Sequence, residues 1–124
     1  MSQVLAVAAG GALGALFRYG VSLGVHGLLG RGFPYGTLAV NVSGSLAMGL
    51  LYVLLLERSA LGPEWRLALL VGLLGAFTTF SSFALETLVL VEEGAPLRAL
   101  LNVVASVVTC LAACWAGLWI GRSL

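Results

Sequence analysis

The chain has 124 residues, of which 60% are hydrophobic and only 9% are charged, and its formal net charge is +1. About a quarter of the residues of an ordinary soluble domain are charged, so this composition excludes a typical water-soluble fold. The six arginines are spread singly along the chain and no lysine is present. A basic patch that could bind nucleic acid is therefore not expected.

Four apolar stretches follow one another, and each is long enough to cross a hydrocarbon core about 30 Å thick. We expect one all-α domain with transmembrane helices at residues 3–29, 35–56, 63–91 and 97–120. Turn-forming sequences separate these spans: GRGFP at residues 30–34, ERSALGP at 57–63 and EEGAP at 92–96. The first stretch is too long and too rich in glycine for a signal peptide, so we expect it to remain as a span.

The first span contains the motif GGALGALFRY at residues 10–19. Gly10 and Gly14 have the small-xxx-small spacing that allows helix backbones to approach closely in a bilayer. Arg18 follows four residues later, and an ionisable group next to hydrocarbon is costly unless it faces water, a partner or a pathway. Arg18 therefore either attracts an anion or extends its guanidinium toward the membrane surface.

The second span begins with GTLAVNVSGS at residues 36–45, which places Thr37, Asn41 and Ser45 on one helical face. Such a polar stripe must face protein or water. Asn41 is the costliest of the three to bury, because lipid cannot satisfy its amide donors and acceptor. Its role is either a contact along a polar pathway or a hydrogen bond that joins two helices.

The third span contains GLLGAFTTFSSF at residues 72–83, where glycines and a run of hydroxyl residues weaken a helix in mid-span. We predict a break here. Unwound backbone at bilayer depth is tolerated only inside protein or beside a cavity, and it frees carbonyl oxygens that can hold a small cation. Phe80 and Phe83 share a helical face at i, i+3, and ordinary core packing would also explain them.

Cys110 and Cys114 stand at i, i+4 on one face of the fourth span. Side chains at this spacing point in parallel, which disfavours a disulfide. We interpret both as small packing residues rather than metal or redox groups.

The arginines give no preferred orientation in the membrane. Four crossings place both termini on one side, and the positive-inside rule then finds equal counts on the two sides: Arg58, Arg66 and Arg122 against Arg18, Arg31 and Arg98. This balance is either accidental in a chain so poor in charge or the mark of dual topology, in which copies insert both ways and pair antiparallel.

The three motifs, in this order on four short spans, resemble the Fluc/CrcB family of fluoride channels over nearly the whole chain. The resemblance implies a multi-pass protein of the bacterial inner membrane that exports fluoride passively. It further implies an antiparallel, dual-topology homodimer with two pores. A structural Na⁺ would lie at the dimer interface, bound by the backbone carbonyls of Gly75 and Thr78 from both subunits.

The resemblance also assigns a fluoride pathway. A narrow pore must replace the water of fluoride with hydrogen-bond donors, and the positive edge of an aromatic ring can face an anion without a formal charge. The implied pathway residues are Phe80, Phe83, Asn41, Ser81, Thr79, Ser106 and Arg18. The assignment extends to Thr37, Asn102 and Cys110, although some relatives carry tyrosine or serine where this chain has the last two.

Three other functions are less consistent with the sequence. A small proton-coupled multidrug exporter requires a glutamate in its first span, which has none here; Glu86 in the third span is expected to pair with Arg18 or reach the headgroups. A non-transporting membrane scaffold would explain the glycines but not the polar stripe beside a helix break. An enzyme is disfavoured because His26, the only histidine, has no carboxylate or nucleophile at catalytic spacing. We expect His26 to be an interfacial residue.

Overall fold

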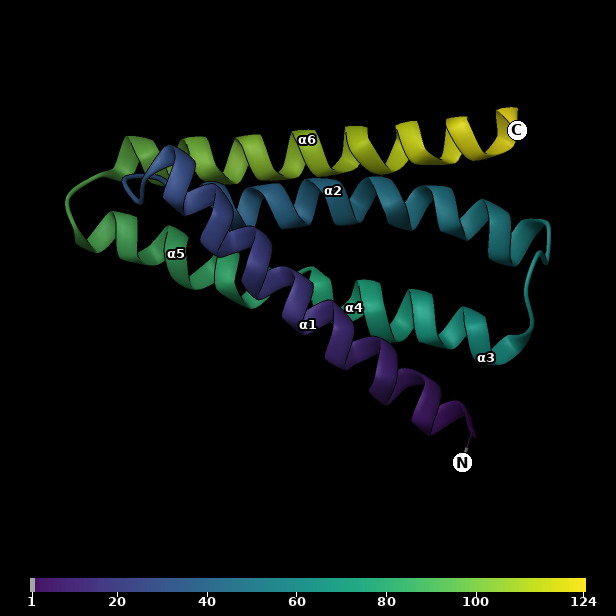
Figure 1. Ribbon diagram of the computed structural model, residues 1–124. Coiled ribbons are helices and arrows are strands. Elements are labelled where there is room, and N and C mark those ends of the chain that lie inside the picture. The colour runs from purple at the N-terminus through teal and green to yellow at the C-terminus, as the bar shows by residue number, and fades with distance from the viewer. Residues whose placement is uncertain (1) are drawn as a thin grey trace.

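Four helical segments make up the computed structural model, which describes residues 2–124. Each is long and apolar enough to cross a membrane: Ser2–Leu29, Tyr35–Glu57, Pro63–Glu92 and Pro96–Ser123. Successive segments run in opposite directions, and the two termini lie at the same end of the molecule (Figure 1). The prediction of four membrane-spanning helices is confirmed.

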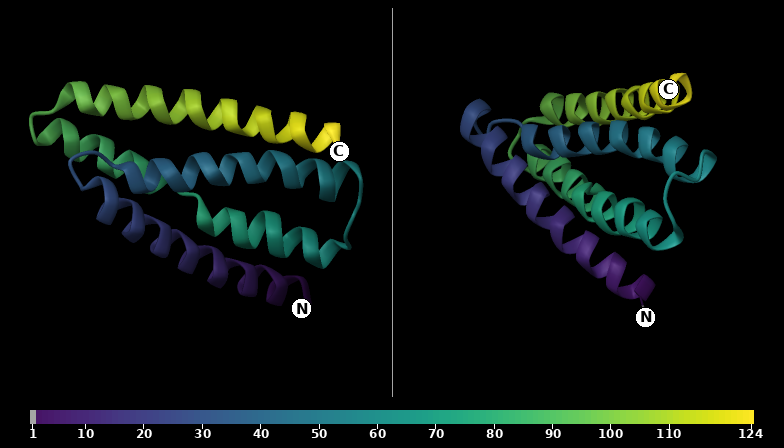
Figure 2. Two further views of the ribbon diagram at one scale, coloured as in Figure 1. Left: turned by 45° about the horizontal axis from the view of Figure 1, so that its top comes forward. Right: turned by 45° about the vertical axis from the view of Figure 1, so that its right-hand side comes forward.

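The first and last segments are single helices, whereas the middle two are composite. α1 (Ser2–Leu29) and α6 (Pro96–Ser123) are continuous α-helices. α2 (Tyr35–Tyr52) continues into the π-helical η1 (Val53–Glu57). The third segment consists of α3 (Pro63–Arg66), the π-helical η2 (Leu67–Leu74), α4 (Gly75–Phe77) and α5 (Phe80–Glu92). Figure 2 shows the gap between α4 and α5 beside α2.

Close backbone contact holds α1 against the third segment. A Cβ atom added to Gly10 would overlap the carbonyl of Ala68, and one added to Gly14 would overlap the carbonyl of Leu73. Both glycines are buried. The small-xxx-small spacing in α1 is therefore used for helix packing, which van der Waals contact stabilises where lipid provides no hydrophobic drive between helices.

A second close contact joins α2 to α6. A Cβ atom on Gly49 of α2 would overlap the carbonyl of Cys114, and one on Gly117 of α6 would overlap the carbonyl of Leu46. Glycine on both helices thus brings the two backbones together at the same level. This contact fixes α6 along α2 (Figure 1).

Apolar side chains cover much of the outer surface. Leu16, Leu111 and Trp115 are each about two-thirds exposed or more, and at most 28% of any span's apolar window is buried within the chain. Most charged residues lie at or near the segment ends, whereas Arg18 and Glu86 lie within spans. The one ion pair within residues 2–124 joins Arg122 to Glu57 at 2.9 Å. An apolar exterior of this extent requires lipid or another apolar surface around it.

Candidate ion pathway

The third helical segment is interrupted at Thr78 and Thr79. Thr78 has φ −86° and ψ 157°, and Thr79 has φ −152° and ψ 118°, so both residues are extended. The helical ladder ends with the Thr78 N–H, which donates to the Leu74 carbonyl at 3.1 Å. α5 then starts afresh at Phe80, with the Thr79 hydroxyl accepting from the Ser82 N–H at 3.2 Å as a helix cap. The break expected in this motif is located at these two threonines.

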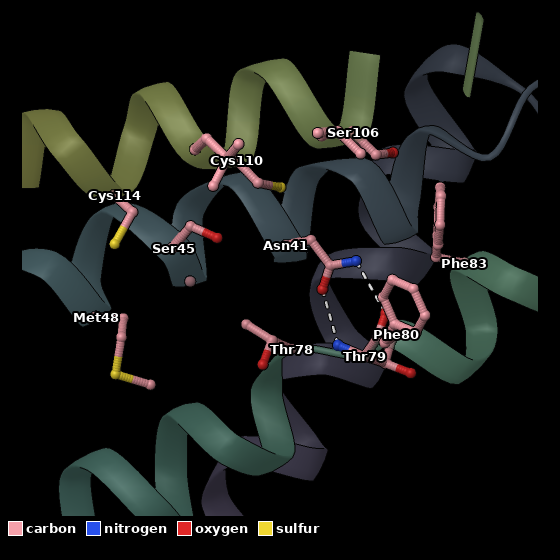
Figure 3. A pocket seen from close by; sticks show the side chains of 13 residues that line it. Asn41, Ser45, Met48, Thr78, Thr79, Phe80, Phe83, Ser106, Cys110 and Cys114 are labelled. Carbon is pink, nitrogen blue, oxygen red and sulfur yellow. Dashed lines mark hydrogen bonds between the residues drawn. The ribbon is translucent and has the colours of Figure 1, made fainter. Parts of the chain in front are cut away.

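Asn41 of α2 satisfies the backbone that the break leaves open. Its Oδ1 accepts a hydrogen bond from the Thr79 N–H at 2.8 Å, and its Nδ2 donates to the Thr79 carbonyl at 2.9 Å (Figure 3). An interrupted helix cannot pair these groups, and lipid cannot replace the missing partners. The Asn41 side chain therefore holds the break against α2. Of the two roles that the sequence allowed for Asn41, this is the hydrogen bond that joins two helices.

Gly44, one helical turn after Asn41, makes room for the same break. A Cβ atom at Gly44 would overlap the Thr78 methyl group and lie 3.2 Å from the Phe77 ring. Asn41 and Gly44 thus act as a pair at i, i+3: the first binds the extended backbone and the second lets it approach. The polar stripe predicted on α2 thus contacts the break through Asn41, and Gly44 beside it provides the space for this contact.

The break leaves carbonyl oxygens without a donor. Among residues 2–124, no group donates a hydrogen bond to the carbonyl of Gly75 or Thr78. The Thr79 N–H that would serve Gly75 is bound to Asn41, and the Ser82 N–H that would serve Thr78 is bound to the Thr79 hydroxyl. The described chain also contains no cluster of three His, Cys, Asp or Glu residues that could hold a metal ion. A small hard cation at this break would therefore be bound by backbone carbonyl oxygens. One chain supplies only two such oxygens, so further oxygen ligands would be needed to complete the coordination shell of the cation.

A groove of about 390 Å³ runs beside the break, between α2, α5 and α6 (Figure 3). None of its lining residues is charged. Several of the residues expected along a pathway meet here, Cys110 among them. The residues that accompany them were not assigned from the sequence and include Met48, Val107, Leu111 and Cys114. The lining consists of Asn41, Gly44, Ser45, Met48, Thr78, Thr79, Phe80, Phe83, Ser106, Val107, Cys110, Leu111 and Cys114.

The two phenylalanines at the groove differ in their burial. Phe83 is 9% exposed, whereas Phe80 is 79% exposed. Their ring centroids lie 5.3 Å apart, with the planes tilted by 45°. Core packing accounts for Phe83 but not for Phe80, which makes too little contact inside the chain. The tilted pair can direct a positive ring edge at an anion beside it.

A chain of hydrogen bonds connects α6 to α5 behind the groove. The Ser106 hydroxyl donates to Asn102 Oδ1 at 3.4 Å, Asn102 Nδ2 donates to the Thr87 hydroxyl at 2.9 Å, and that hydroxyl donates to the Phe83 carbonyl at 2.7 Å. Asn102 is only 2% exposed and does not line the groove, so its side chain positions α6 against α5. Ser106 reaches the groove wall from the same row.

A second cavity of about 340 Å³ lies on the other side of the break, next to α1. In contrast to the groove, it contains charged side chains, and Thr79 lines both spaces. Ser81 lines neither; its hydroxyl lies 3.2 Å from that of Thr79. The cavity is lined by Ala15, Arg18, Tyr19, Ser22, Leu23, His26, Arg31, Thr37, Thr79, Ser82 and Glu86.

Glu86 is not paired with Arg18, contrary to the expectation from the sequence. Its Oε1 accepts a hydrogen bond from the buried Thr37 hydroxyl at 2.6 Å, and its Oε2 is buried with no partner in the described chain. Arg18 lines the same cavity and forms no ion pair with any of the residues that the structure describes. The reason is positional: the first turn of α2 brings Thr37 against α5, and this contact captures the carboxylate.

His26 also has a more specific place than the expected interfacial one. Its Nε2 accepts a hydrogen bond from the Gly36 N–H at 3.2 Å, so the imidazole of α1 caps the first turn of α2. A Cβ at Gly36 would lie 3.0 Å from the ring, which shows how closely the two are packed. No signal in the sequence identifies this contact, because the two residues belong to different spans.

The family model described as CrcB-like protein, Camphor Resistance (CrcB), matches residues 5–118. The chain belongs to the CrcB family. The matched region contains the break, the groove and the second cavity, so the whole candidate pathway lies within the CrcB part of the chain.

Curated relatives in the CrcB family carry the name fluoride-specific ion channel FluC. One from Methylococcus capsulatus is 59% identical over 104 residues, which is 84% of this chain but only 46% of the relative, so the chain spans less than half of that protein. One from Shewanella amazonensis is 54% identical over 104 residues, or 84% of this chain and 83% of the relative. One from Aeromonas salmonicida is 52% identical over 103 residues, covering 83% and 82% of the two chains.

Proposed function

We propose that this chain is a fluoride-selective ion channel of the bacterial membrane through which fluoride leaves the cell passively. The relatives that match it over most of their length are named as fluoride-specific channels, not as enzymes. The structural observation that carries the proposal is the break at Thr78 and Thr79. Asn41 holds it open between two cavities, and Thr79 lines both.

The contrast between the two cavities suits the movement of a small anion. Arg18 and Arg31 line the second cavity, where their positive charge attracts an anion from water, and Glu86 supplies the one carboxyl group there. The groove contains hydroxyl and amide groups and ring edges, but no charged side chain. An ion there exchanges water for weak donors and is not held by a fixed charge, which favours release as well as entry.

The channel works as an antiparallel, dual-topology homodimer in this proposal. One side of the groove is open in a single chain, as the 79% exposure of Phe80 illustrates, and a second chain would complete the wall. The balanced arginines allow both orientations in the membrane. Two antiparallel copies would also bring their helix breaks together.

A Na⁺ between the paired breaks is part of the same proposal. The carbonyls of Gly75 and Thr78 have no donor within residues 2–124, and two chains would supply four such oxygens. Oxygen ligands of this kind can replace the water of an alkali cation. The ion would satisfy the open carbonyls and join the two subunits.

Growth in fluoride tests the function. Expression in a bacterium that lacks its own fluoride exporter should restore growth, whereas an unrelated four-helix membrane protein at equal abundance should not. Loss of growth despite confirmed insertion would contradict the proposal.

Lysines added to one loop provide a test of the antiparallel dimer. Two or three lysines added to the loop at Arg31 should fix one orientation and lower activity, because positive charge holds a short loop in the cytoplasm. Co-expression with a copy that has lysines added near Arg58 should restore activity. A single-orientation variant that remains fully active alone would exclude the antiparallel arrangement.

A further inference from the structure

Three of the side chains that line the groove contain sulfur. Met48 comes from α2, and Cys110 and Cys114 come from α6. Both cysteines are free thiols, and all three residues are half-buried. In Figure 3 the Cys114 sulfur points from α6 toward α2, the flexible Met48 side chain extends from α2 away from α6, and the Cys110 sulfur is turned toward Ser106. We call these three residues the sulfur cluster.

The contact between α2 and α6 determines where the sulfur cluster forms. Gly49, the neighbour of Met48, lies so close to α6 that a Cβ atom there would overlap the Cys114 carbonyl. Met48 is therefore held at the level of Cys114 by backbone contact and not by a flexible loop. The sequence alone favours packing for the two thiols, because it does not show that a third sulfur, from another helix, lines the same groove.

The spacing of the thiols suits a metal ion better than a disulfide. Cβ atoms at i, i+4 on a helix are about 5–6 Å apart, whereas a disulfide needs about 3.5–4.5 Å. Two metal–thiolate bonds of about 2.3 Å each can span up to about 4.6 Å between the sulfurs. The Cys114 side chain leans toward Cys110, because helical side chains point back toward the N-terminus. Cysteine has more than one staggered χ1 rotamer, so we expect a bound metal to reorient the Cys110 sulfur without moving the backbone.

The ligand types select the metal. Thiolate and thioether sulfur prefer soft cations such as Cu⁺, Ag⁺ and Hg²⁺, and no histidine or carboxylate lines the groove to favour a harder ion. Binding of Hg²⁺ would break both S–H bonds, form two Hg–S bonds and release two protons. The product is neutral overall, which matters because a net charge is costly in an apolar setting.

We propose that the sulfur cluster is a binding site for a soft, thiophilic metal cation, with Cys110 and Cys114 as thiolate ligands and Met48 as a thioether ligand. Cys110 also stands beside Ser106 in the same groove wall. If the groove carries fluoride, as the proposed function holds, a metal bound there narrows the route and blocks fluoride flux.

Titration of the purified, full-length protein with HgCl₂ tests binding without any transport. One Hg²⁺ per chain should consume both free thiols and release two protons. Cys110→Ser, Cys114→Ser and Met48→Leu should each weaken binding, the cysteine variants by at least about tenfold. Ser43→Ala, an exposed site on α2 outside the groove, is the matched control and should bind normally. Two Hg²⁺ per chain, or unchanged affinity in either cysteine variant, would show that the thiols act independently and overturn the site.

Fluoride efflux from liposomes tests the block. HgCl₂ should stop efflux through the original protein, dithiothreitol should restore it, and Cys114→Ser should be inhibited less, each relative to its own metal-free rate. Metal bound at the expected stoichiometry with full efflux would refute the position of the cluster on the route. Absence of fluoride efflux before metal is added would instead contradict the proposed function, and the titration would still decide the metal site.

Discussion

Replacement of Asn41 by leucine should release the helix break from α2. Leucine is similar in size but removes both hydrogen bonds to Thr79, at 2.8 and 2.9 Å, and leaves the Thr79 N–H and carbonyl without partners. Each bond contributes about 1 kcal/mol net, and each buried group left unpaired costs about 1–3 kcal/mol. Because Thr79 is only half-buried, we expect Asn41→Leu to lower the free energy of unfolding by about 2–4 kcal/mol.

Unfolding in detergent and fluoride efflux from liposomes together measure this effect. Ser43→Ala is the matched control on the same helix, because the Ser43 hydroxyl bonds only to carbonyls of its own helix, at Ala39 and Val40. The control should change stability by less than about 0.5 kcal/mol. Asn41→Leu should lose both stability and fluoride efflux. A stability loss below about 1 kcal/mol with normal efflux would refute the role of Asn41 at the break.

Three further predictions concern the break, the rings and the cation. Gly44→Ala should cost about 1–3 kcal/mol, because its new methyl overlaps the Thr78 side chain, whereas Gly24→Ala, which has open space around it, should not destabilise the protein; equal effects in thermal unfolding would contradict the packing. Phe80→Ile and Phe83→Ile should each reduce fluoride flux strongly while gel filtration still shows a folded protein, and normal flux in a folded variant would remove that ring from the pathway. Exchange of Na⁺ for a bulky organic cation should weaken the dimer in detergent, and unchanged dimer stability would argue against the central cation.

The sequence was sufficient for the spans and for the existence of the break. Four apolar stretches and their turns predict the helices, because hydrocarbon thickness sets the length of a span. The GLLGAFTTFSSF motif predicts a weak point, since glycine and hydroxyl residues compete with helical hydrogen bonding. The exact position, at Thr78 and Thr79, depends on Asn41 in another span, and the helical face of Asn41 does not identify its partner.

The partners of buried polar groups were the least predictable part of the site. The sequence predicts that Glu86 pairs with Arg18 or reaches the headgroups, whereas the structure places both residues in one cavity and the Thr37 hydroxyl donates to Glu86 at 2.6 Å. For His26 the sequence predicts only an interfacial position, and the structure adds a specific partner, the Gly36 N–H at the start of α2. In both cases the decisive distance lies between helices, and helical periodicity describes which residues share a face without saying what that face meets.

Fluoride and chloride efflux from liposomes that contain only this protein tests the central claim most directly. The groove has neutral donors and ring edges but no fixed charge, so we predict rapid efflux of fluoride down its gradient with little chloride, and no requirement for a proton gradient. Equal efflux of the two anions, or fluoride movement only when a proton gradient is imposed, would contradict a passive fluoride-selective channel.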